Sequence, residues 1–312
     1  MNIDKGLNYG IIGNCKSTAL INEDSSIDWC CLPQFDSSAI FCKIIDNHIG
    51  GSFKIEAAES YIITQQYINN TAIVRTNFKN PKNEFEVLDF MTRYKLDDQN
   101  FYSPPEIQRL IKPIKGLPKI KVLYNPTLEY ANGKTKTYEK EDFIVSVFDE
   151  ASYETLFLYT DIEKKKILEN KEFELSKSVY LNLSYNEKID LPSLSKSKEE
   201  LKKTQDYWLN WCKKAPSFKS YNKEITRSSI TLKLLTFEKT GAVLAAATTS
   251  IPETIGEVRN WDYRFCWIRD ASMVIKIIAK LGHQRIVKNF IDFIVNLIPN
   301  KNEKLQIMYG ID

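Results

Sequence analysis

Between about Tyr9 and Tyr185 the chain repeats short runs in which apolar and polar residues alternate. Such alternation places every second side chain on one face of a β-strand, and NP, NG and KNPKN turn signals separate many of the runs. The clearest runs are GGSFKI (50–55), AIVRTNF (72–78), EFEVLDFM (84–91), KIKVLY (119–124), DFIVSVF (142–148), ETLFLY (154–159) and SVYLNLSY (178–185). Because these strands follow one another without helices between them, the pattern predicts an antiparallel β-sandwich.

The period of the apolar residues changes from two to about 3.6 near Asp190. In LPSLSKSKEELKK, Ser197 precedes Glu200 by the spacing of a capping box, which predicts that a helix begins there. One face of this helix would carry Leu201, Thr204, Trp208, Trp211 and Cys212. We interpret the segment as a linker helix that leaves the sandwich.

Three more helical patterns follow the linker. They run from about Lys223 to Lys239 before Gly241, from about Arg269 to the residue before Gly282, and from about 284 to 298 before Pro299. Their inward stripes would be Ile225, Ser229, Leu232 and Leu235; Met273, Val274, Ile277, Ile278 and Leu281; and Ile286, Val287, Phe290, Phe293, Ile294 and Leu297. Successive helices with short breaks between them predict αα-hairpins.

Composition narrows the function classes. A chain of 312 residues is expected to hold two domains, and its formal charge of +3, with both signs interspersed, argues against a polyanion as partner. The lysine-rich EKKKI (163–167) is interpreted as a solvated surface turn. No apolar segment reaches the length of a membrane span and the N-terminus lacks a secretion signal, so we expect a soluble, cytoplasmic protein.

The cysteines and histidines do not form a metal-binding pattern. Six cysteines without a C-x-x-C pair and two histidines lack the usual ligand spacing, so we expect free thiols and no metal. GIIGNCKST (10–18) superficially resembles a phosphate loop. However, Cys15 stands where the Walker pattern needs glycine, and Thr18-Ala-Leu-Ile-Asn reads as a strand, so we do not expect nucleotide binding.

The stretch RNWDYRFCWIRDAS (259–272) concentrates aromatic and ionic residues ahead of a predicted helix. In a structural interpretation, Asp270 caps the first turn of that helix and Arg269 is its partner. In a functional interpretation, an indole of Trp267 stacks on a sugar ring while Arg269 and Asp270 bind adjacent hydroxyls. The residues alone leave both interpretations open.

Two regions of the chain resemble glycoside hydrolase family 15, which includes glucoamylases, glucodextranases and trehalase-like enzymes. They are GAVLAAATTSIPETIGEVRNWDYRFCWIRDASMVIKII (241–278) and YGIIGNCKSTALINEDSSIDWCCLPQFDSSAIFCKIID (9–46), with GGSFKI, VLDFMT (87–92) and PPEIQRLI (104–111) fitting the same template. The resemblance implies a multidomain β plus α fold: a super-β-sandwich (1–190), a linker helix (191–218) and the first helices of an (α/α)6 toroid (219–312).

The resemblance also implies a reaction and a substrate site. Family members cleave α-glucosidic bonds with inversion and need no cofactor, and the substrate here would be trehalose, a maltooligosaccharide or a dextran. Trp267, Arg269 and Asp270 match the family's W-x-R-D segment, whose arginine and aspartate hold the glucose. Asp262, Tyr263 and Arg264 match the supporting residues just before it, and Trp261 is a further candidate.

The catalytic acids are where the chain departs from the family. Both are glutamates on later toroid loops, whereas this sequence stops at KLQIMYGID, so neither acid is assigned. Glu253 and Glu257 are interpreted as surface or capping charges. We therefore expect the chain alone to be inactive.

The toroid of the family has twelve helices, so the few helices expected here would leave apolar stripes uncovered. A second polypeptide that completes the toroid, a fragment and a degraded gene product all remain open. The alternatives to an enzyme are a non-catalytic sugar-binding or assembly protein that keeps the glucose site, and a sandwich that serves only to dock a partner.

Overall fold

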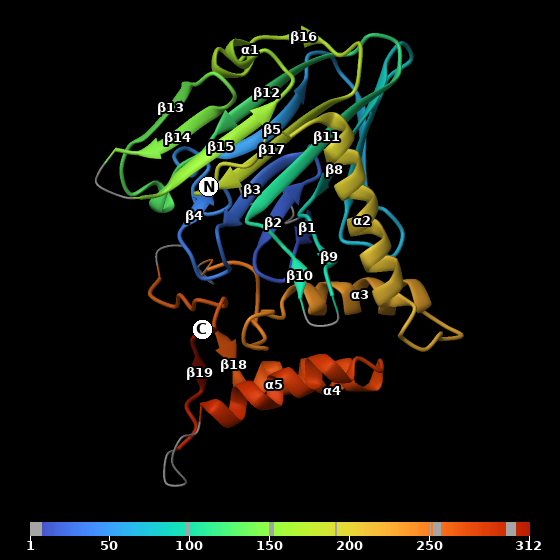
Figure 1. The fold of residues 1–312 in the computed structure, drawn as a ribbon, viewed down its shortest axis with the longest axis vertical. Helices are drawn as coiled ribbons and strands as arrows, with labels where there is room; N and C mark the ends of the chain where they lie inside the picture. The colour runs from blue at the N-terminus through green and yellow to red at the C-terminus, as the bar shows by residue number, and fades with distance from the viewer. Residues whose placement is uncertain are drawn as a thin grey trace. The chain divides into compact units, whose positions relative to one another are not determined.

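The computed structural model describes residues 8–97, 100–149, 153–190, 192–249, 251, 257–297 and 304–312. The chain divides into two compact units, Met1–Tyr207 and Trp208–Asp312. Each unit has its own arrangement of elements (Figure 1).

The larger sheet of the first unit has eight antiparallel strands in the order β13-β14-β15-β17-β11-β8-β7-β6. In the pairing of β11 with β17 the register is regular and Gln108 lies opposite Asn182, whereas the register of β11 with β8 shifts between Pro113 and Lys115. The strands are β6 (Ile62–Tyr67), β7 (Val74–Lys79), β8 (Glu84–Phe90), β11 (Glu106–Lys115), β13 (Thr135–Glu139), β14 (Ile144–Phe148), β15 (Thr155–Thr160) and β17 (Val179–Tyr185).

The smaller sheet has seven strands, in the order β1-β2-β3-β5-β12-β16 with β4 paired to β3. Its strands are β1 (Tyr9–Gly13), β2 (Thr18–Asn22), β3 (Ser26–Cys31), β4 (Ala39–Phe41), β5 (Ser52–Ala57), β12 (Lys119–Asn125) and β16 (Phe173–Glu174). Two short strands, β9 (Tyr94–Lys95) and β10 (Phe101–Tyr102), pair separately, and Glu129–Ala131 form a 3-10 turn. Thr18–Asn22 is thus a strand and not the start of a nucleotide-binding helix.

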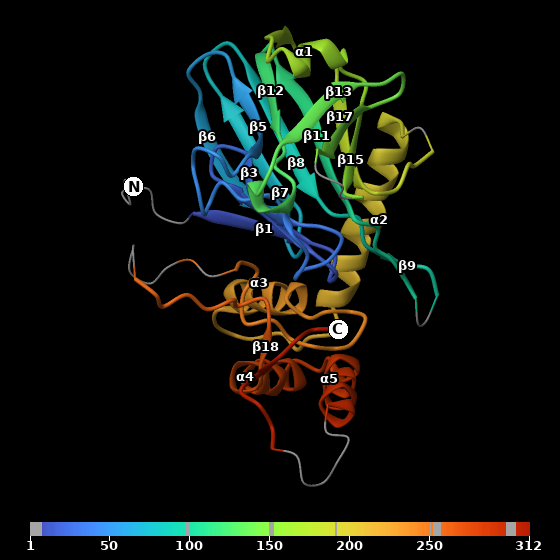
Figure 2. The ribbon, with the colours of Figure 1, turned by 90° about the vertical axis from the view of Figure 1, so that its left-hand side faces the viewer.

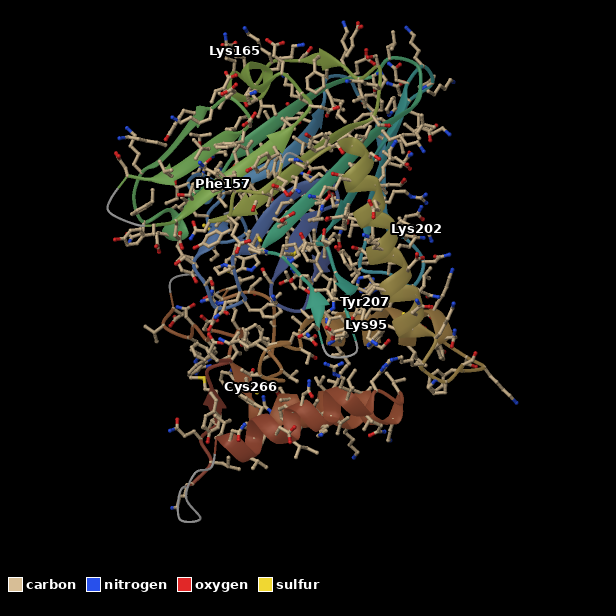
Figure 3. The ribbon with its side chains drawn as sticks, viewed as in Figure 1. Lys95, Phe157, Lys165, Lys202, Tyr207 and Cys266 are labelled. Atoms are coloured by element: carbon tan, nitrogen blue, oxygen red, sulfur yellow. The ribbon has the colours of Figure 1, made fainter. Side chains whose placement is uncertain are left out.

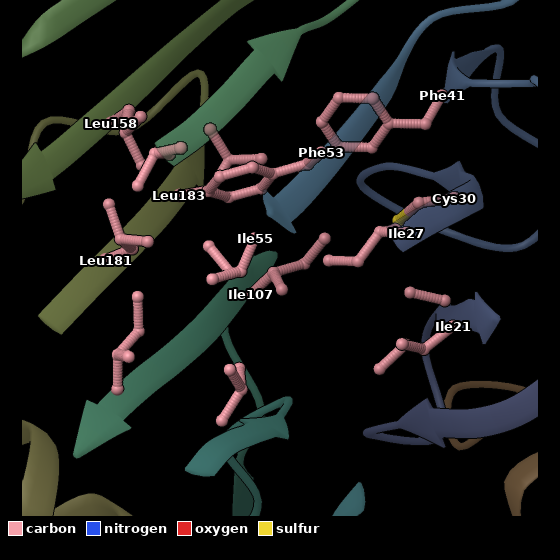
Figure 4. Packing of buried hydrophobic residues seen from close by; sticks show 14 of the residues in the cluster. Ile21, Ile27, Cys30, Phe41, Phe53, Ile55, Ile107, Leu158, Leu181 and Leu183 are labelled. Atoms are coloured by element: carbon pink, nitrogen blue, oxygen red, sulfur yellow. The ribbon is translucent and has the colours of Figure 1, made fainter. Parts of the chain in front are cut away.

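The hydrophobic core of the first unit lies between the two sheets, which form the layers of a sandwich (Figures 1 and 2). Buried side chains from both sheets meet there, including Phe53 and Ile55 from the smaller sheet and Ile107 and Leu183 from the larger one (Figure 4). All seven runs that the alternation singled out are strands. The prediction of a β-sandwich is confirmed.

A surface segment of the sandwich differs from its prediction. EKKKI was expected to be a turn, but Lys164–Leu168 form a short helix, α1, beside β12 and β13. Ile167 of this helix is buried in the core, whereas Lys165 lies at the surface (Figure 3). Burial of the Ile167 side chain in the core stabilises this short helix. The run of charged residues gave no indication of that contact.

Helix α2 (Leu194–Cys212) begins in the first unit, where it covers the outer face of the larger sheet. Its Leu194 and Leu201 pack on a cluster that includes Leu110 and Tyr180. Of the expected inward face, Thr204, Trp208 and Trp211 are buried, whereas Leu201 and Cys212 are partly exposed.

The predicted capping box of α2 is wrong. Ser197 and Glu200 are buried within the helix, and the backbone N–H of Lys196 instead donates to Ser193 Oγ at 3.1 Å. The helix therefore begins one turn earlier than the capping pattern indicated, because Ser193 satisfies its free amide.

The second unit contains helices α3 (Asn222–Leu234), α4 (Ile268–Lys280) and α5 (Gln284–Asn296) and the short strands β18 (Cys266–Trp267) and β19 (Met308–Tyr309). Helix α3 ends before the expected Lys239. After Leu234 the chain reverses in a tight hairpin, in which Thr236 pairs with Val243 and Phe237 N–H donates to the carbonyl of Ala242. The order of the helices agrees with the sequence pattern. Helix α3 is shorter than predicted because the residues after Leu234 form this hairpin instead of continuing the helix.

The apolar stripes of α4 and α5 are only partly covered. Ile278, Phe290 and Phe293 are buried, as expected. Met273 and Ile277, expected to face inward, are exposed, as are Ile291 and Val295. A group of apolar side chains on this helical pair therefore remains in contact with solvent.

The cysteines form no disulfide bonds. All six cysteines are free, and five of them are buried, Cys266 among them. No helix within the described ranges combines the length and the apolar character needed to cross a membrane.

Candidate functional site

The predicted site segment is held from both sides by backbone hydrogen bonds. Ala245 N–H donates to the carbonyl of Phe265 at 3.3 Å, and Ala246 N–H donates to that of Tyr263 at 2.9 Å. On the other side, strand β18 pairs with β19, so that Trp267 lies opposite Met308. Residues far apart in the sequence therefore fix the path of the chain just before α4.

Asp262 and Arg264 form the charged support of the segment. Arg264 Nη2 lies 2.6 Å from Asp262 Oδ2, Arg264 Nε donates to Oδ1 at 3.0 Å, and the guanidinium is buried. Burial acts to raise the pKa of the Asp262 carboxyl, but hydrogen bonds from Arg264, its charge and a hydrogen bond from Thr249 together lower it. Asp262 is therefore ionised at neutral pH and holds Arg264 in a bidentate pair.

Two aromatic rings, those of Trp261 and Tyr263, lie beside Trp267. The Trp261 ring is perpendicular to it at a centroid distance of 6.4 Å, and the Tyr263 ring lies 6.2 Å away at an angle of 31°. The indole N–H of Trp267 points to the carbonyl of Asp262 at 3.4 Å. The orientation of Trp267 thus depends on the same turn that Asp262 and Arg264 shape, and about half of the Trp261 side chain remains accessible as a stacking surface.

Arg269 and Asp270 lie in the first turn of α4 and pair with each other. Arg269 Nε is 2.9 Å from Asp270 Oδ1, and Nη2 is 3.3 Å from Oδ2. The Arg269 side chain is 75% exposed and that of Asp270 34% exposed, so neither is turned into the core. Asp270 lies in the first turn, where a negative charge is favourable, but the residue at the cap is Trp267 and no side chain caps this helix.

The sequence-predicted residues therefore fall into two groups. Contacts join Asp262, Arg264 and the three aromatic residues, and Arg269 and Asp270 form an ion pair at the start of the next helix. The hydrogen bond from Thr249 and the pairing with β19 were not predicted. The alternating apolar residues of LQIMYGI are the one signal that could have indicated a strand there.

Other candidate acids and metal ligands add little to this site. Glu257 is exposed, and Glu253 lies outside the described residues. Across the part of the chain that the structure describes, no group of three or more histidine, cysteine, aspartate or glutamate side chains could hold a metal ion.

Comparison with known protein families matches both units. Residues 7–178 match the family described as trehalase-like, N-terminal, and residues 219–312 match glycosyl hydrolases family 15. The second match contains the whole candidate site.

Curated relatives include several proteins named trehalase. The one from Thermoplasma volcanium is 30% identical over 97% of this chain and 49% of its own length, and the one from Thermoplasma acidophilum is 32% identical over 94% and 51%. One from Mycobacterium tuberculosis is 26% identical over 97% of this chain and 48% of its own length. The chain thus spans about half the length of the curated relatives it matches.

Proposed function

Because the chain belongs to the trehalase-like branch of glycoside hydrolase family 15, we propose that it supplies the sandwich and the glucose-binding segment of an enzyme that hydrolyses α-glucosidic bonds. The relatives named trehalase point to trehalose as the substrate. In this proposal residues 1–190 form the sandwich, 191–218 the linker helix and 219–312 the first helices of an (α/α)6 toroid. The rest of the toroid lies outside residues 1–312, in keeping with relatives about twice as long.

Arg269 and Asp270 bind the glucose unit in this proposal. An exposed guanidinium and a partly exposed carboxylate can hold adjacent hydroxyls in bidentate geometry, and solvent reaches both side chains at the start of α4. Pairing with each other keeps them aligned until the sugar arrives. The accessible Arg269–Asp270 pair is the observation that carries the proposal.

The neighbouring residues shape the surface on which the sugar lies. Trp261, Tyr263 and Trp267 offer aromatic faces for the apolar side of a pyranose. Asp262 and Arg264 act behind them, because their buried pair fixes the turn that orients Trp267. A ligand without matching hydroxyls would leave these polar groups unpaired, which gives selectivity.

Inverting hydrolysis needs two carboxyl groups. One carboxylic acid protonates the leaving oxygen while one carboxylate removes a proton from the attacking water, and the two are roughly 6.5–9.5 Å apart. We assign neither role to a residue between 1 and 312. This chain alone should therefore bind the sugar without releasing glucose.

Isothermal titration with trehalose and with glucose tests the proposal. Binding by the wild-type chain should weaken at least about tenfold in Arg269→Ala, which removes a charge-assisted bidentate contact. Lys276→Ala, which removes an exposed charge from the same helix, should bind as the wild type does. No binding of either sugar, or equal loss in both variants, would contradict the assignment, and glucose release by the chain alone would show that the acids lie within it.

A further inference from the structure

A small polar cavity lies inside the first unit, between the outer face of the larger sheet and the first turns of α2. Its volume is about 20 Å³, which is enough for one water molecule. Strands β10, β11 and β17 and helix α2 contribute side chains to its wall, among them Tyr102, Glu106, Gln108, Asn182, Lys196 and Glu200. The cavity is distinct from the candidate sugar site, because all of these residues belong to the first unit.

The amide nitrogens at this cavity are committed to the carboxyl groups. Asn182 Nδ2 donates to Glu106 Oε2 at 3.0 Å, and Gln108 Nε2 donates to Glu200 Oε2 at 2.6 Å. The carbonyl oxygens of the same two amides, Gln108 Oε1 and Asn182 Oδ1, are buried and have no hydrogen-bond partner. A buried acceptor without a donor is unfavourable, so two sites in the cavity lack a proton donor.

The same wall carries two carboxyl groups on different elements, Glu106 on β11 and Glu200 on α2, and both are buried. Two carboxyl groups and two unpaired carbonyl oxygens therefore share one wall. A proton on Glu106 removes one of the two buried negative charges and adds an O–H donor to a wall that also carries the two unpaired carbonyl oxygens.

We propose that Glu106 holds a proton while the first turns of α2 are docked on the sheet, and that loss of this proton as the pH rises loosens their docking. Glu200 also accepts a hydrogen bond from Thr92 at 2.9 Å, so the cavity network joins α2 to the sheet directly. Helix α2 continues from the sandwich into the second unit along the chain. The device thus acts on the linker segment and does not depend on the proposed sugar site.

Burial and the groups that surround Glu106 together favour its protonated form. Burial is the largest cause and raises its pKa from 4.5 to about 7; the hydrogen bond from Asn182 opposes this. The charges of Glu200 and Glu187 raise the pKa and that of Lys196 lowers it, while Tyr102 also faces the two glutamates. Since the pKa is raised in the folded state, the stabilisation is complete below pH 4.5, is lost as the pH rises to about 7, and stays lost above that.

Hydrogen–deuterium exchange of the full chain tests the proposal at the amides of Leu201 to Tyr207. After correction for the intrinsic rate, the opening equilibrium constant of the wild type should rise on the order of a hundredfold between pH 5 and pH 8, as the pKa shift requires. Glu106→Gln keeps the shape and supplies amide protons, so it should stay protected at both pH values. The matched control Glu199→Gln, on the solvent face of α2, should keep the wild-type dependence on pH.

The same pH dependence of the opening equilibrium constant in wild type and Glu106→Gln would overturn the proposal. An equal loss of protection in Glu106→Gln at pH 5 and pH 8 would also overturn it, because that result indicates a structural role only. A measurement on the wild type covers the case in which Glu106→Gln does not fold. The infrared band of protonated carboxyl groups should persist above pH 6, with a midpoint that falls in Glu200→Gln because a neighbouring negative charge is removed. Loss of the whole band by pH 5.5 would also overturn the proposal.

Discussion

Arg109 and Asp89 form a buried ion pair at directly opposed positions of β11 and β8. Arg109 Nε lies 2.7 Å from Asp89 Oδ1, and solvent reaches neither side chain. The same guanidinium donates to the carbonyls of Ser25 and Phe53. Phe53 lies in β5 and Ser25 directly precedes β3, and both strands belong to the smaller sheet. One side chain therefore joins the two layers of the sandwich while its charge is compensated.

Arg109→Ala should lower the free energy of unfolding by about 3–5 kcal/mol, because it leaves the Asp89 carboxylate buried without a partner. Lys112→Ala on the same strand is the matched control. Its ammonium lies 3.7 Å from Glu86 and is 56% exposed, so the loss should stay below about 1 kcal/mol. Urea unfolding followed by circular dichroism measures both variants, and similar losses would contradict the role given to Arg109.

Gly241 should not tolerate a side chain. Its φ is +87°, and an added Cβ would lie 2.5 Å from the backbone carbonyl of Asn289 in α5. Gly241→Ala should therefore cost more than the roughly 1–2 kcal/mol of a left-handed alanine. Gly310→Ala, where an added Cβ meets nothing within 4 Å, should change the melting temperature little. Equal melting temperatures for the two variants would argue against the tight hairpin after α3.

The second unit should lose stability in acid through His283. This ring stacks on Trp211 at a centroid distance of 3.9 Å, and burial, with the charges of Lys233 and Lys214, lowers its pKa from 6.5 to about 4. Because the unfolded chain takes up the proton first, stability should fall by about 1–3 kcal/mol as the pH drops from 6.5 to 4.

His283→Phe keeps an aromatic ring and should abolish this acid dependence, read from tryptophan fluorescence during urea unfolding. The other histidine provides the control. His48 is exposed in the first unit, so His48→Phe should leave the acid dependence unchanged. An unchanged acid profile in His283→Phe would assign the effect to other groups.

Arg264→Ala should weaken trehalose binding roughly tenfold through Trp267, since it removes the bidentate partner of Asp262 that shapes the turn. Asp262→Asn should have a similar effect. Because the two residues act as a pair, the double variant should cost little more than either single one. Isothermal titration of all three variants measures this, and additive losses would mean that each residue acts separately.

The fold of the first unit followed from the sequence wherever alternation was regular. Strands β5 and β7 combine an apolar face toward the core with polar residues on the other side, whereas β14, β15 and β17 carry a second apolar cluster on their outer face. Strand β11 was not predicted from alternation, because the charged Arg109 occupies an inward position between Ile107 and Ile111. A local pattern cannot show that a charge is inward when its partner, Asp89, is on another strand.

The candidate site was predicted in part for a related reason. The residues Trp267, Arg269 and Asp270 were identifiable as a dense group of aromatic and ionic side chains before a helix. Which charges pair could not be read from their spacing: Arg264 joins Asp262 across two positions, and Arg269 joins its neighbour Asp270. The cavity around Glu106 was not foreseen at all, because its members come from β10, β11, β17 and α2.

The pairing of β18 with β19 also sets an order in time. Trp267 and Met308 can meet only after residues 268–307 have been synthesised, whereas the sandwich is built from strands that leave the ribosome long before. During translation the turn before α4 is therefore left without one of its two hydrogen-bonded neighbours. A nascent chain arrested before Met308 should carry a finished sandwich and a site segment whose backbone is held on one side only.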